Sequence, residues 1–384
     1  MMLINRARAA TGYSFFVLGS LLGSWASRIP DIQIQLSVSE ADFGLLLLAM
    51  AIGAVVSLPL SGTLMGRFGA ARMTKIFGIV VVVLFAAVPL ISSFLAILPL
   101  VLAIGFAMGT LDVSMNGWGA EVEEDIGRSV MQSFHGLYSL GAAVGAGVGA
   151  LTLMLEWSTT LHFAVWTVIV LVPQFLVVQT HWCPVQLDEE LHTGSLFAIP
   201  KGALLYVGLM ALAAALAEGA NTDWAALYQI RELGIDPADA ATSFSVFSVA
   251  MLALRMFGDR LVERFGAVLI ARISGVLACV GAVMLVYGGG IWTIWTALAI
   301  MGVGNALIFP LAISRAAMQP GVPKGVAIAS VATLGYGAFL LGPPLLGFVA
   351  ELVSLRAVFV IVVFVGFLVP LFAGWFEKPV RAKP

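Results

Sequence analysis

Long apolar segments separated by short polar turns fill this sequence, and twelve of them have about 20 residues or more. An α-helix of that length crosses the hydrocarbon core of a bilayer. No soluble core could absorb so much apolar surface, since 61% of the 384 residues are hydrophobic and only 10% are charged. The segments cover residues 13–35, 41–65, 73–92, 95–119, 131–154, 158–178, 201–223, 239–257, 267–287, 291–314, 325–350 and 355–376. We therefore predict an all-α integral membrane protein with twelve transmembrane helices.

The basic residues fix an expected orientation. Of the 19 Lys and Arg residues, all but Arg28, Arg231 and Arg356 fall on the side of the predicted membrane that holds the N-terminus. Because cytoplasmic loops carry the excess of Lys and Arg, we predict that both termini of this multi-pass membrane protein are cytoplasmic. A net charge of −2 leaves no basic excess, which argues against nucleic acid as a partner.

An internal repeat divides the chain. A shift of 197 residues pairs the sequence LMGRFGA at 64–70 with LVERFGA at 261–267. The longest polar interval, 179–200, lies between the two copies. We therefore predict two homologous, pseudo-symmetric six-helix halves, residues 1–178 and 201–384 with a short cytoplasmic tail, joined by a cytoplasmic linker at 179–200.

Two polar residues interrupt the apolar segment 95–119. Asp112 and Asn116 are four residues apart, so on a helix they share a face. Insertion scales put an aspartate at mid-bilayer at roughly 2.5 to 3.5 kcal/mol, a cost that persists where the group faces protein or water and is useful there. We interpret Asp112 as the residue that couples transport to protons. The alternative is a carboxylate that joins two helices through a buried hydrogen bond.

Further polar residues lie in other apolar segments. His135 has a reference pKa near 6.5, so a proton relay between Asp112 and His135 is our second hypothesis, against a role as a cytoplasmic-end residue bonded to a loop. Arg28 is expected at the outer membrane interface, where it pairs with Asp31 or meets an anionic substrate group. Asn305 precedes Pro310, whose missing N–H loosens the helix there.

Small residues and prolines mark places of close packing and bending. The ladder Gly141, Gly145 and Gly149 predicts close helix packing. Pro343 and Pro344 predict a break in the segment 325–350.

At the turn 62–72 the sequence resembles the signature G-x-L-x-D-R-x-G-R-R of the major facilitator superfamily, and the turn after 239–257 repeats it. The aspartate of that signature is Gly66 here, while the second copy keeps a carboxylate as Glu263. In that family this carboxylate helps to lock the two halves on the cytoplasmic side, and helices 1, 4, 7 and 10 line a central cavity. The resemblance therefore implies a set of gating residues, Arg67, Arg72, Asp259, Glu263 and Arg264.

The stretches 25–31, 132–136 and 217–224 also resemble the fucose permease branch of that superfamily and its related inner-membrane proteins. In the sugar permeases the fourth helix carries an acid with an amide four residues later, which Asp112 and Asn116 match. Those proteins use the acid as a proton site beside the sugar, and this is what the resemblance implies for Asp112.

The polar residues and the resemblance together lead to one functional prediction. We expect a proton-coupled secondary transporter, a symporter that moves a sugar, polyol or cyclitol by alternating access, with protons, a small-molecule substrate and the bilayer as partners, and a monomer. The expected substrate-binding residues are Trp25, Asp31, Asn116, Gln132, Tyr138, Glu218, Asn221, Trp224 and Asn305.

Two other functions stay open at this stage. One is a proton-driven exporter of small amphipathic compounds, and the other is a non-transporting membrane sensor. We predict no enzyme, cofactor or metal, since no nucleophile with a base, metal cluster or phosphate loop is visible in the sequence.

Overall fold

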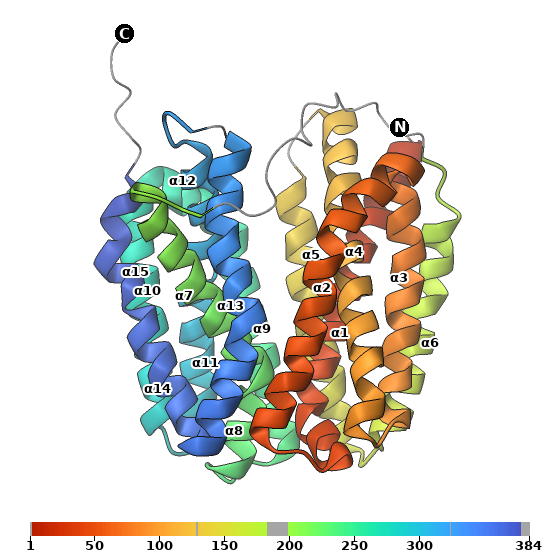
Figure 1. The fold of residues 1–384 in the computed structure, drawn as a ribbon, viewed down its shortest axis with the longest axis vertical. Coiled ribbons are helices and arrows are strands. Elements are labelled where there is room, and N and C mark those ends of the chain that lie inside the picture. The colour runs from red at the N-terminus through yellow and green to blue at the C-terminus, as the bar shows by residue number, and fades with distance from the viewer. Residues whose placement is uncertain (1, 128–129, 183–198, 323, 378–384) are drawn as a thin grey trace. The chain divides into compact units, whose positions relative to one another are not determined.

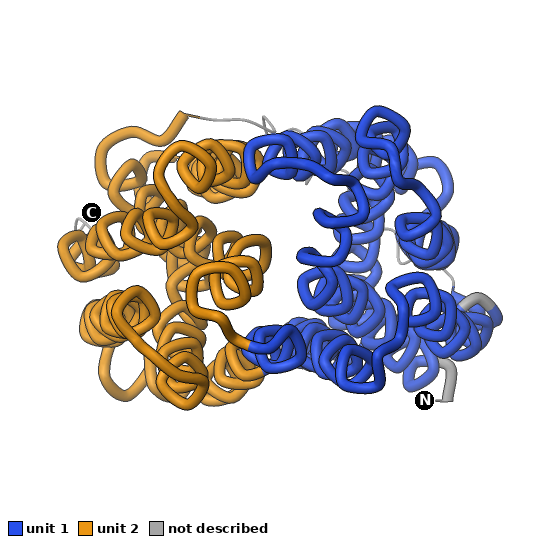
Figure 2. Tube along the Cα trace, turned by 90° about the horizontal axis from the view of Figure 1, so that it is seen from below, with its two compact units in different colours: residues 1–188, 236–245 blue, residues 189–235, 246–384 orange. Residues whose placement is uncertain are grey.

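The computed structural model describes residues 2–127, 130–182, 199–322 and 324–377, and these residues form helices joined by short turns. The chain divides into two compact units (Figure 2), unit 1 with residues 1–188 and 236–245 and unit 2 with residues 189–235 and 246–384. Each unit is a bundle of helices that run side by side (Figure 1). The expected linker, 179–200, lies for the most part outside the described residues.

Unit 1 is built around its first helix. Its elements are α1 (Met2–Leu36), α2 (Glu40–Phe68), α3 (Ala70–Ala87), the 3-10 turn η1 (Val88–Leu90), α4 (Phe94–Ile126), α5 (Met131–Met154) and α6 (Thr159–Val178). Helix α1 packs most extensively against α5 and also contacts α3, α4 and α6, while α2 packs along α4. The outer helices therefore cover α1 on several sides.

Glycines allow the backbones of α1 and α5 to approach closely. Gly141 and Gly145 of α5 face the carbonyl groups of Phe16 and Ser20, so neither position has room for a Cβ. Gly19 of α1 faces the carbonyl of Tyr138 in the same way. The predicted close packing of the glycine ladder is confirmed: Gly141 and Gly145 contact backbone, while Gly149 packs against the side chain of Ser27.

Eleven helices of the described residues are long and apolar enough to cross a membrane, and α1 is not among them. Its composition explains this, because hydroxyl residues replace many apolar ones. Thr11 donates to the carbonyl of Ala7 at 2.9 Å, and Ser14 donates to that of Ala10 at 3.0 Å. Such bonds back to the preceding turn satisfy the hydroxyls inside a protein core. Helix α1 faces protein on several sides, so it needs less apolar surface than helices that face lipid.

Unit 2 contains the remaining elements. They are α7 (Ala203–Asp223), α8 (Ala225–Arg231), α9 (Pro237–Phe265, whose first part belongs to unit 1), α10 (Ala267–Tyr287), α11 (Ile291–Asn305), α12 (Ile308–Ala317), α13 (Lys324–Leu352), α14 (Leu355–Gly366), α15 (Leu368–Phe372) and η3 (Ala373–Phe376). Helix α7 packs against α13, and α10 packs against α11 and α14.

The predicted loosening before Pro310 is confirmed, since α11 ends at Asn305 and α12 begins at Ile308. Pro310 has no N–H to donate to the carbonyl of Ala306. Arg255 of α9 donates to that carbonyl through Nε at 3.2 Å and so replaces the missing helix bond.

The predicted break at Pro343 and Pro344 is wrong. Both prolines lie inside the continuous helix α13. The φ of proline fits a helix, so two adjacent prolines remove two hydrogen bonds and do not have to end it.

The repeated sequence adopts the same local structure in both copies. Gly69 has φ 82° and ψ 146°, and Gly266, 197 residues later, has φ 81° and ψ 150°. This conformation is accessible only to glycine. The N–H of Gly69 donates to the carbonyl of Met65 at 2.8 Å, and that of Gly266 donates to Val262 at 2.9 Å. The shift of 197 residues therefore relates equal turns.

A close helix contact is repeated as well. Gly105 of α4 faces the carbonyl of Met50 on α2, and Gly302 of α11 faces the carbonyl of Phe247 on α9. The same shift of 197 residues relates both members of the contact.

We predict that Gly105→Ala and Gly302→Ala each lower the thermal stability of the purified protein. The added Cβ meets a backbone carbonyl that cannot rotate away, and overpacking of this kind costs about 1–3 kcal/mol. Gly62→Ala is the matched control, because nothing lies near its Cβ and alanine favours helix. Unfolding temperatures in detergent measure the effect, and equal temperatures for Gly105→Ala and Gly62→Ala would contradict the expected contact.

Candidate functional site

The carboxylate of Asp112 lies midway along α4, partly exposed, with Asn116 one turn further on. Asn116 Nδ2 donates to the carbonyl oxygen of Asp112 at 2.8 Å and to its Oδ1 at 3.3 Å. The predicted shared face is therefore confirmed. Within the described residues Asn116 is the only hydrogen-bond partner of this carboxylate, and no cation pairs with it. The group lacks the partners that hold a permanently charged buried acid in place.

Neighbouring hydroxyls on α4 do not supply those partners. Thr110 Oγ1 donates to the carbonyl of Phe106 at 2.9 Å, and Ser114 Oγ donates to that of Leu111 at 3.1 Å. Both hydroxyls are bonded within their own helix. Asp112 is thus left with one long hydrogen bond, an arrangement that suits a group able to gain and lose a proton.

The polar residues at the start of α5 lie on the same unit as Asp112. The exposed ring of His135 contacts Phe15 of α1 edge-on, with ring centroids 5.2 Å apart. Tyr138 is partly exposed one turn later, and its backbone faces Gly19. Gln132 belongs to α5, and its side chain lies outside the described residues. The relay between Asp112 and His135 stays a prediction.

Helix α7 carries the second polar group. Asn221, 2% exposed, donates through Nδ2 to the carbonyl of Ala217 at 3.0 Å, and Thr222 donates to that of Glu218 at 2.9 Å. The Oδ1 of Asn221 has no hydrogen-bond partner among the described residues. Glu218 is partly exposed and Trp224, where α7 ends, is buried in unit 2.

Asn305 lies at the break between α11 and α12. Its Nδ2 donates to the carbonyl of Ala214 on α7 at 2.9 Å, so its amide joins two helices of unit 2. A small cavity of about 10 Å³, lined by Ala214, Ala217 and Asn305 among others, lies beside this contact. A space of that size holds no more than a water molecule.

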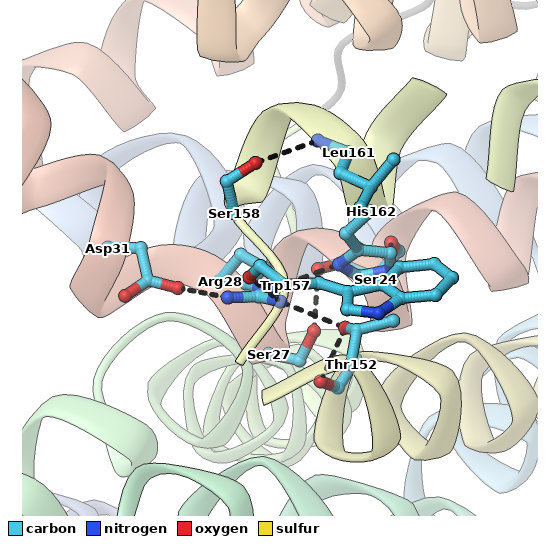
Figure 3. Close-up of polar contacts among 10 residues, drawn as sticks. Ser24, Ser27, Arg28, Asp31, Thr152, Trp157, Ser158, Leu161 and His162 are labelled. Carbon is cyan, nitrogen blue, oxygen red and sulfur yellow. Dashed lines mark hydrogen bonds and ion pairs between the residues drawn. The ribbon is translucent and has the colours of Figure 1, made fainter. Parts of the chain in front are cut away.

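A third cluster surrounds Arg28 at the end of α1 (Figure 3). Its Nη1 donates to Asp31 at 2.7 Å, and its Nε donates to Nδ1 of His162 on α6 at 3.1 Å. Its Nη2 donates to Oγ1 of Thr152 at 2.9 Å and to the carbonyl of Trp157 at 3.1 Å. The guanidinium thus joins α1 to α5, α6 and the turn between them.

This geometry fixes the protonation of His162. Arg28 Nε can only donate, so Nδ1 of His162 must accept, and the ring is neutral with its proton on Nε2. That Nε2 lies 3.0 Å from the hydroxyl oxygen of Ser24, which accepts a hydrogen bond from the Nε2–H group. The network therefore requires one tautomer of one uncharged imidazole.

The expected pairing of Arg28 with Asp31 is confirmed, and the expected place of Arg28 at the outer membrane interface stays a prediction. Arg28 is 2% exposed, because its hydrogen bonds to three elements enclose it. Sequence reasoning missed His162 and Thr152. A lone imidazole in the apolar segment 158–178 is a signal that points to a buried partner.

Trp25 lies in the core of unit 1 and is 2% exposed. Its ring stacks with Phe43 at 6.4 Å between centroids and meets Phe85 edge-on at 6.1 Å. These contacts give Trp25 a packing role beside the Arg28 cluster.

Comparison with known proteins identifies the family. The family described as Major Facilitator Superfamily matches residues 202–384. An uncharacterized MFS-type transporter of Yersinia pestis is 30% identical over 352 residues, 92% of this chain and 91% of that protein. The chain belongs to the major facilitator superfamily. The uncharacterized transporter y4wD of Sinorhizobium fredii (strain NBRC 101917 / NGR234) is 38% identical over 350 residues, covering 91% of this chain and 92% of that protein.

A solved structure supports the fold of this superfamily member. The crystal structure of the nucleoside transporter NupG covers 99% of this chain and 100% of that chain with a TM-score of 0.74 and 19% identity. Together with the helices long and apolar enough to cross a membrane, the relatives show a multi-pass membrane transporter of the MFS type.

The signature turns of this superfamily member hold exposed arginines over aromatic rings. Arg67 lies over the ring of Phe68 at 5.2 Å, and Arg264 lies over that of Phe265 at the same distance. Arg72 lies over Phe68 at 5.7 Å. Glu263 is exposed, and the side chain of Asp259 lies outside the described residues. Their expected gating role stays a prediction.

We predict that Arg28→Gln strongly destabilises unit 1. Without the guanidinium, the buried acceptors His162 and Thr152 lose their donor, and a buried polar group left without a partner costs about 1–3 kcal/mol. Arg356→Gln is the control, since Arg356 is half exposed and its ion pair with Glu232 is long, at 3.9 Å. A thermal unfolding series that ranks the two variants equally would refute the structural role of the Arg28 cluster.

Proposed function

We propose that the protein is a proton-coupled secondary transporter that carries a small hydroxylated solute by alternating access. The observation that carries this proposal is the Asp112 carboxylate, which lies within a membrane-spanning helix with one hydrogen-bond partner and no cation among the described residues. A charged acid in that position is costly, and a protonated acid is not. Gain and loss of one proton therefore changes the energy of the site in each transport cycle.

Polar groups on a helix of each unit support a hydroxylated substrate. Asn116 presents an amide beside Asp112, and the Oδ1 of buried Asn221 lacks a partner in the described part of the chain. Amide and carboxylate oxygens accept hydrogen bonds from substrate hydroxyls. Sugars, polyols and cyclitols meet this requirement, and so does the ribose of a nucleoside, the class of solute for which the transporter NupG is named.

The architecture that we propose has twelve transmembrane helices, with α1 as the twelfth, in two pseudo-symmetric halves at 1–178 and 201–384. Its support is the equal turns at Gly69 and Gly266 and the equal contacts at Gly105 and Gly302. We propose that both termini are cytoplasmic, that the membrane is the inner membrane and that the protein works as a monomer. The stretches 25–31, 132–136 and 217–224 support a place near the fucose permease branch.

Uptake into proteoliposomes tests the coupling. We expect wild type to concentrate one member of a panel of sugars, polyols, cyclitols and nucleosides when a pH gradient is imposed. Asp112→Asn keeps the shape of the side chain without its titration, so it is expected to retain counterflow and to lose accumulation. Asp125→Asn is the matched control, because Asp125 lies exposed near the end of the same helix.

Two outcomes would overturn parts of this proposal. If Asp112→Asn accumulates solute as well as wild type does, Asp112 is not the coupling residue. If an outward-directed proton gradient drives uptake into the vesicles, the protein exchanges solute for protons. The alternative function, a proton-driven exporter, is then the correct one.

Asn221→Ala tests the substrate contact. Loss of one hydrogen bond to the solute is expected to raise KM about 2- to 10-fold with little effect on the maximal rate. Thr222→Val is the control, because the Thr222 hydroxyl is already bonded to the carbonyl of Glu218. A KM that responds to Thr222→Val and not to Asn221→Ala would place the substrate elsewhere.

A further inference from the structure

A cavity of about 550 Å³ opens between the first turns of α1 and the last turns of α6. Its walls include Arg6 and Tyr13 from α1, and Pro173, Leu176 and Thr180 from α6 and the residues after it. All belong to unit 1, and none belongs to the transport site proposed above. The volume is in the range of pockets that hold a sizeable organic ligand.

Hydrogen bonds fix both ends of this cavity. The hydroxyl of Tyr13 donates to the carbonyl of Val170 at 2.7 Å and so ties α1 to α6. The ammonium of Lys75 on α3 donates to the carbonyl of Thr180 and holds the chain that leaves α6. Between these ties, α1 presents only the small side chains of Ala9 and Ala10. The space is therefore built into the packing of α1 and α6.

The polar end of the cavity is positively charged. Among the described residues that line it, Arg6 alone is charged, and Arg6 is exposed with no hydrogen bond or ion pair to any other described residue. Lys75 brings a second positive charge to the wall at Thr180. No acidic side chain of the part of the chain that the structure describes lines the cavity. A ligand with a negatively charged end complements this arrangement.

The other end of the cavity continues onto an apolar surface. Val168, Val172, Phe175 and Leu176 of α6 are each more than half exposed. In a membrane transporter, exposed apolar side chains on a spanning helix face lipid tails. Leu176 belongs both to this surface and to the cavity wall, so a ligand in the cavity reaches the lipid-facing side of α6 directly.

We propose that this cavity binds an anionic phospholipid, with the phosphate against Arg6 and an acyl chain along the exposed face of α6. Charge at one end and an apolar surface at the other match the two parts of such a lipid. In the orientation proposed above, the site lies in the cytoplasmic leaflet. The lipid site does not depend on Asp112 or on the transported solute.

Native mass spectrometry of the full chain, released from detergent micelles, tests this proposal. Phosphatidylglycerol and phosphatidylcholine with identical acyl chains are added at equal concentration, and we expect preferential retention of phosphatidylglycerol. Arg6→Gln is expected to weaken its binding about fivefold, the effect of one basic residue near the membrane surface. Arg8→Gln is the control, because Arg8 lies two residues away and does not line the cavity.

Filling the cavity provides a second test that keeps the charge. Ala9→Trp places a large ring in the cavity and is expected to abolish retention of phosphatidylglycerol. Ala164→Trp adds the same ring to an exposed position of α6 outside the cavity and is expected to leave retention unchanged. Unfolding temperatures of the four variants show whether each is folded.

Four outcomes would overturn the proposal. The first is equal retention of the two lipids, and the second is an equal loss of phosphatidylglycerol binding in folded Arg6→Gln and Arg8→Gln. The third is retention of phosphatidylglycerol by Ala9→Trp. The fourth is displacement of the lipid by millimolar inorganic phosphate, which would identify a site for a free anion. The acidic residues Asp188, Glu189 and Glu190 of the following segment are the competing occupant. If the variant with these three residues neutralised retains phosphatidylglycerol and wild type does not, the segment and not the lipid fills the cavity.

Discussion

Every backbone N–H and C=O in a lipid-embedded chain must find its partner within the protein, and this constraint governs the structure. It accounts for the helices, in which each residue bonds to its own segment. It also accounts for the bonding at the interruption between α11 and α12. There Pro310 removes a donor, and Arg255 supplies another to the carbonyl of Ala306. A charged side chain from a neighbouring helix thus completes the backbone bonding of a broken one.

The same constraint separates structural polar groups from candidate functional ones. Most hydroxyls in the membrane-spanning helices bond back to their own turn, as Thr110 and Ser114 do, and Arg28 has acceptors on each side of its guanidinium. Asp112 and the Oδ1 of Asn221 are different, because the described residues leave them with few partners or none. Incomplete bonding in a costly environment makes them candidates, a property that they share with the buried amide of Gln174. Because each nitrogen of the Arg28 guanidinium has an acceptor, we give Arg28 a structural role although it is charged.

The sequence predicted segment positions well where apolar length and glycine or proline signals coincide. The predicted span 267–287 agrees with α10, and Pro310 marked the break in α11. The equal turns at Gly69 and Gly266 follow from the repeat, because only glycine adopts their backbone angles. The predicted break at Pro343 was wrong, because it rested on the proline alone. The residues on both sides of the proline continue the helix α13.

Side-chain partners between distant segments could not be predicted. Periodicity shows which face of a helix is polar, but not which helix lies against it. For Arg28 the pairing with Asp31, three residues away, was foreseen, and its bond to His162 was missed. The pairing of Asp112 with Asn116 was predicted because both residues lie on one helix, where spacing alone determines the contact. Trp25 shows the same limit, since only the structure reveals its contacts with Phe43 and Phe85.

The position of Arg28 has a consequence for how the protein is made. Its acceptors Thr152 and His162 lie 124 and 134 residues further along the chain, so the ribosome synthesises α1 long before the groups that satisfy it. During that interval α1, rich in hydroxyls and carrying a buried cation, is poorly suited to contact with lipid. Biogenesis of unit 1 therefore requires α1 to remain in a polar surrounding, at the translocon or among the early helices, until α5 and α6 emerge and close around it.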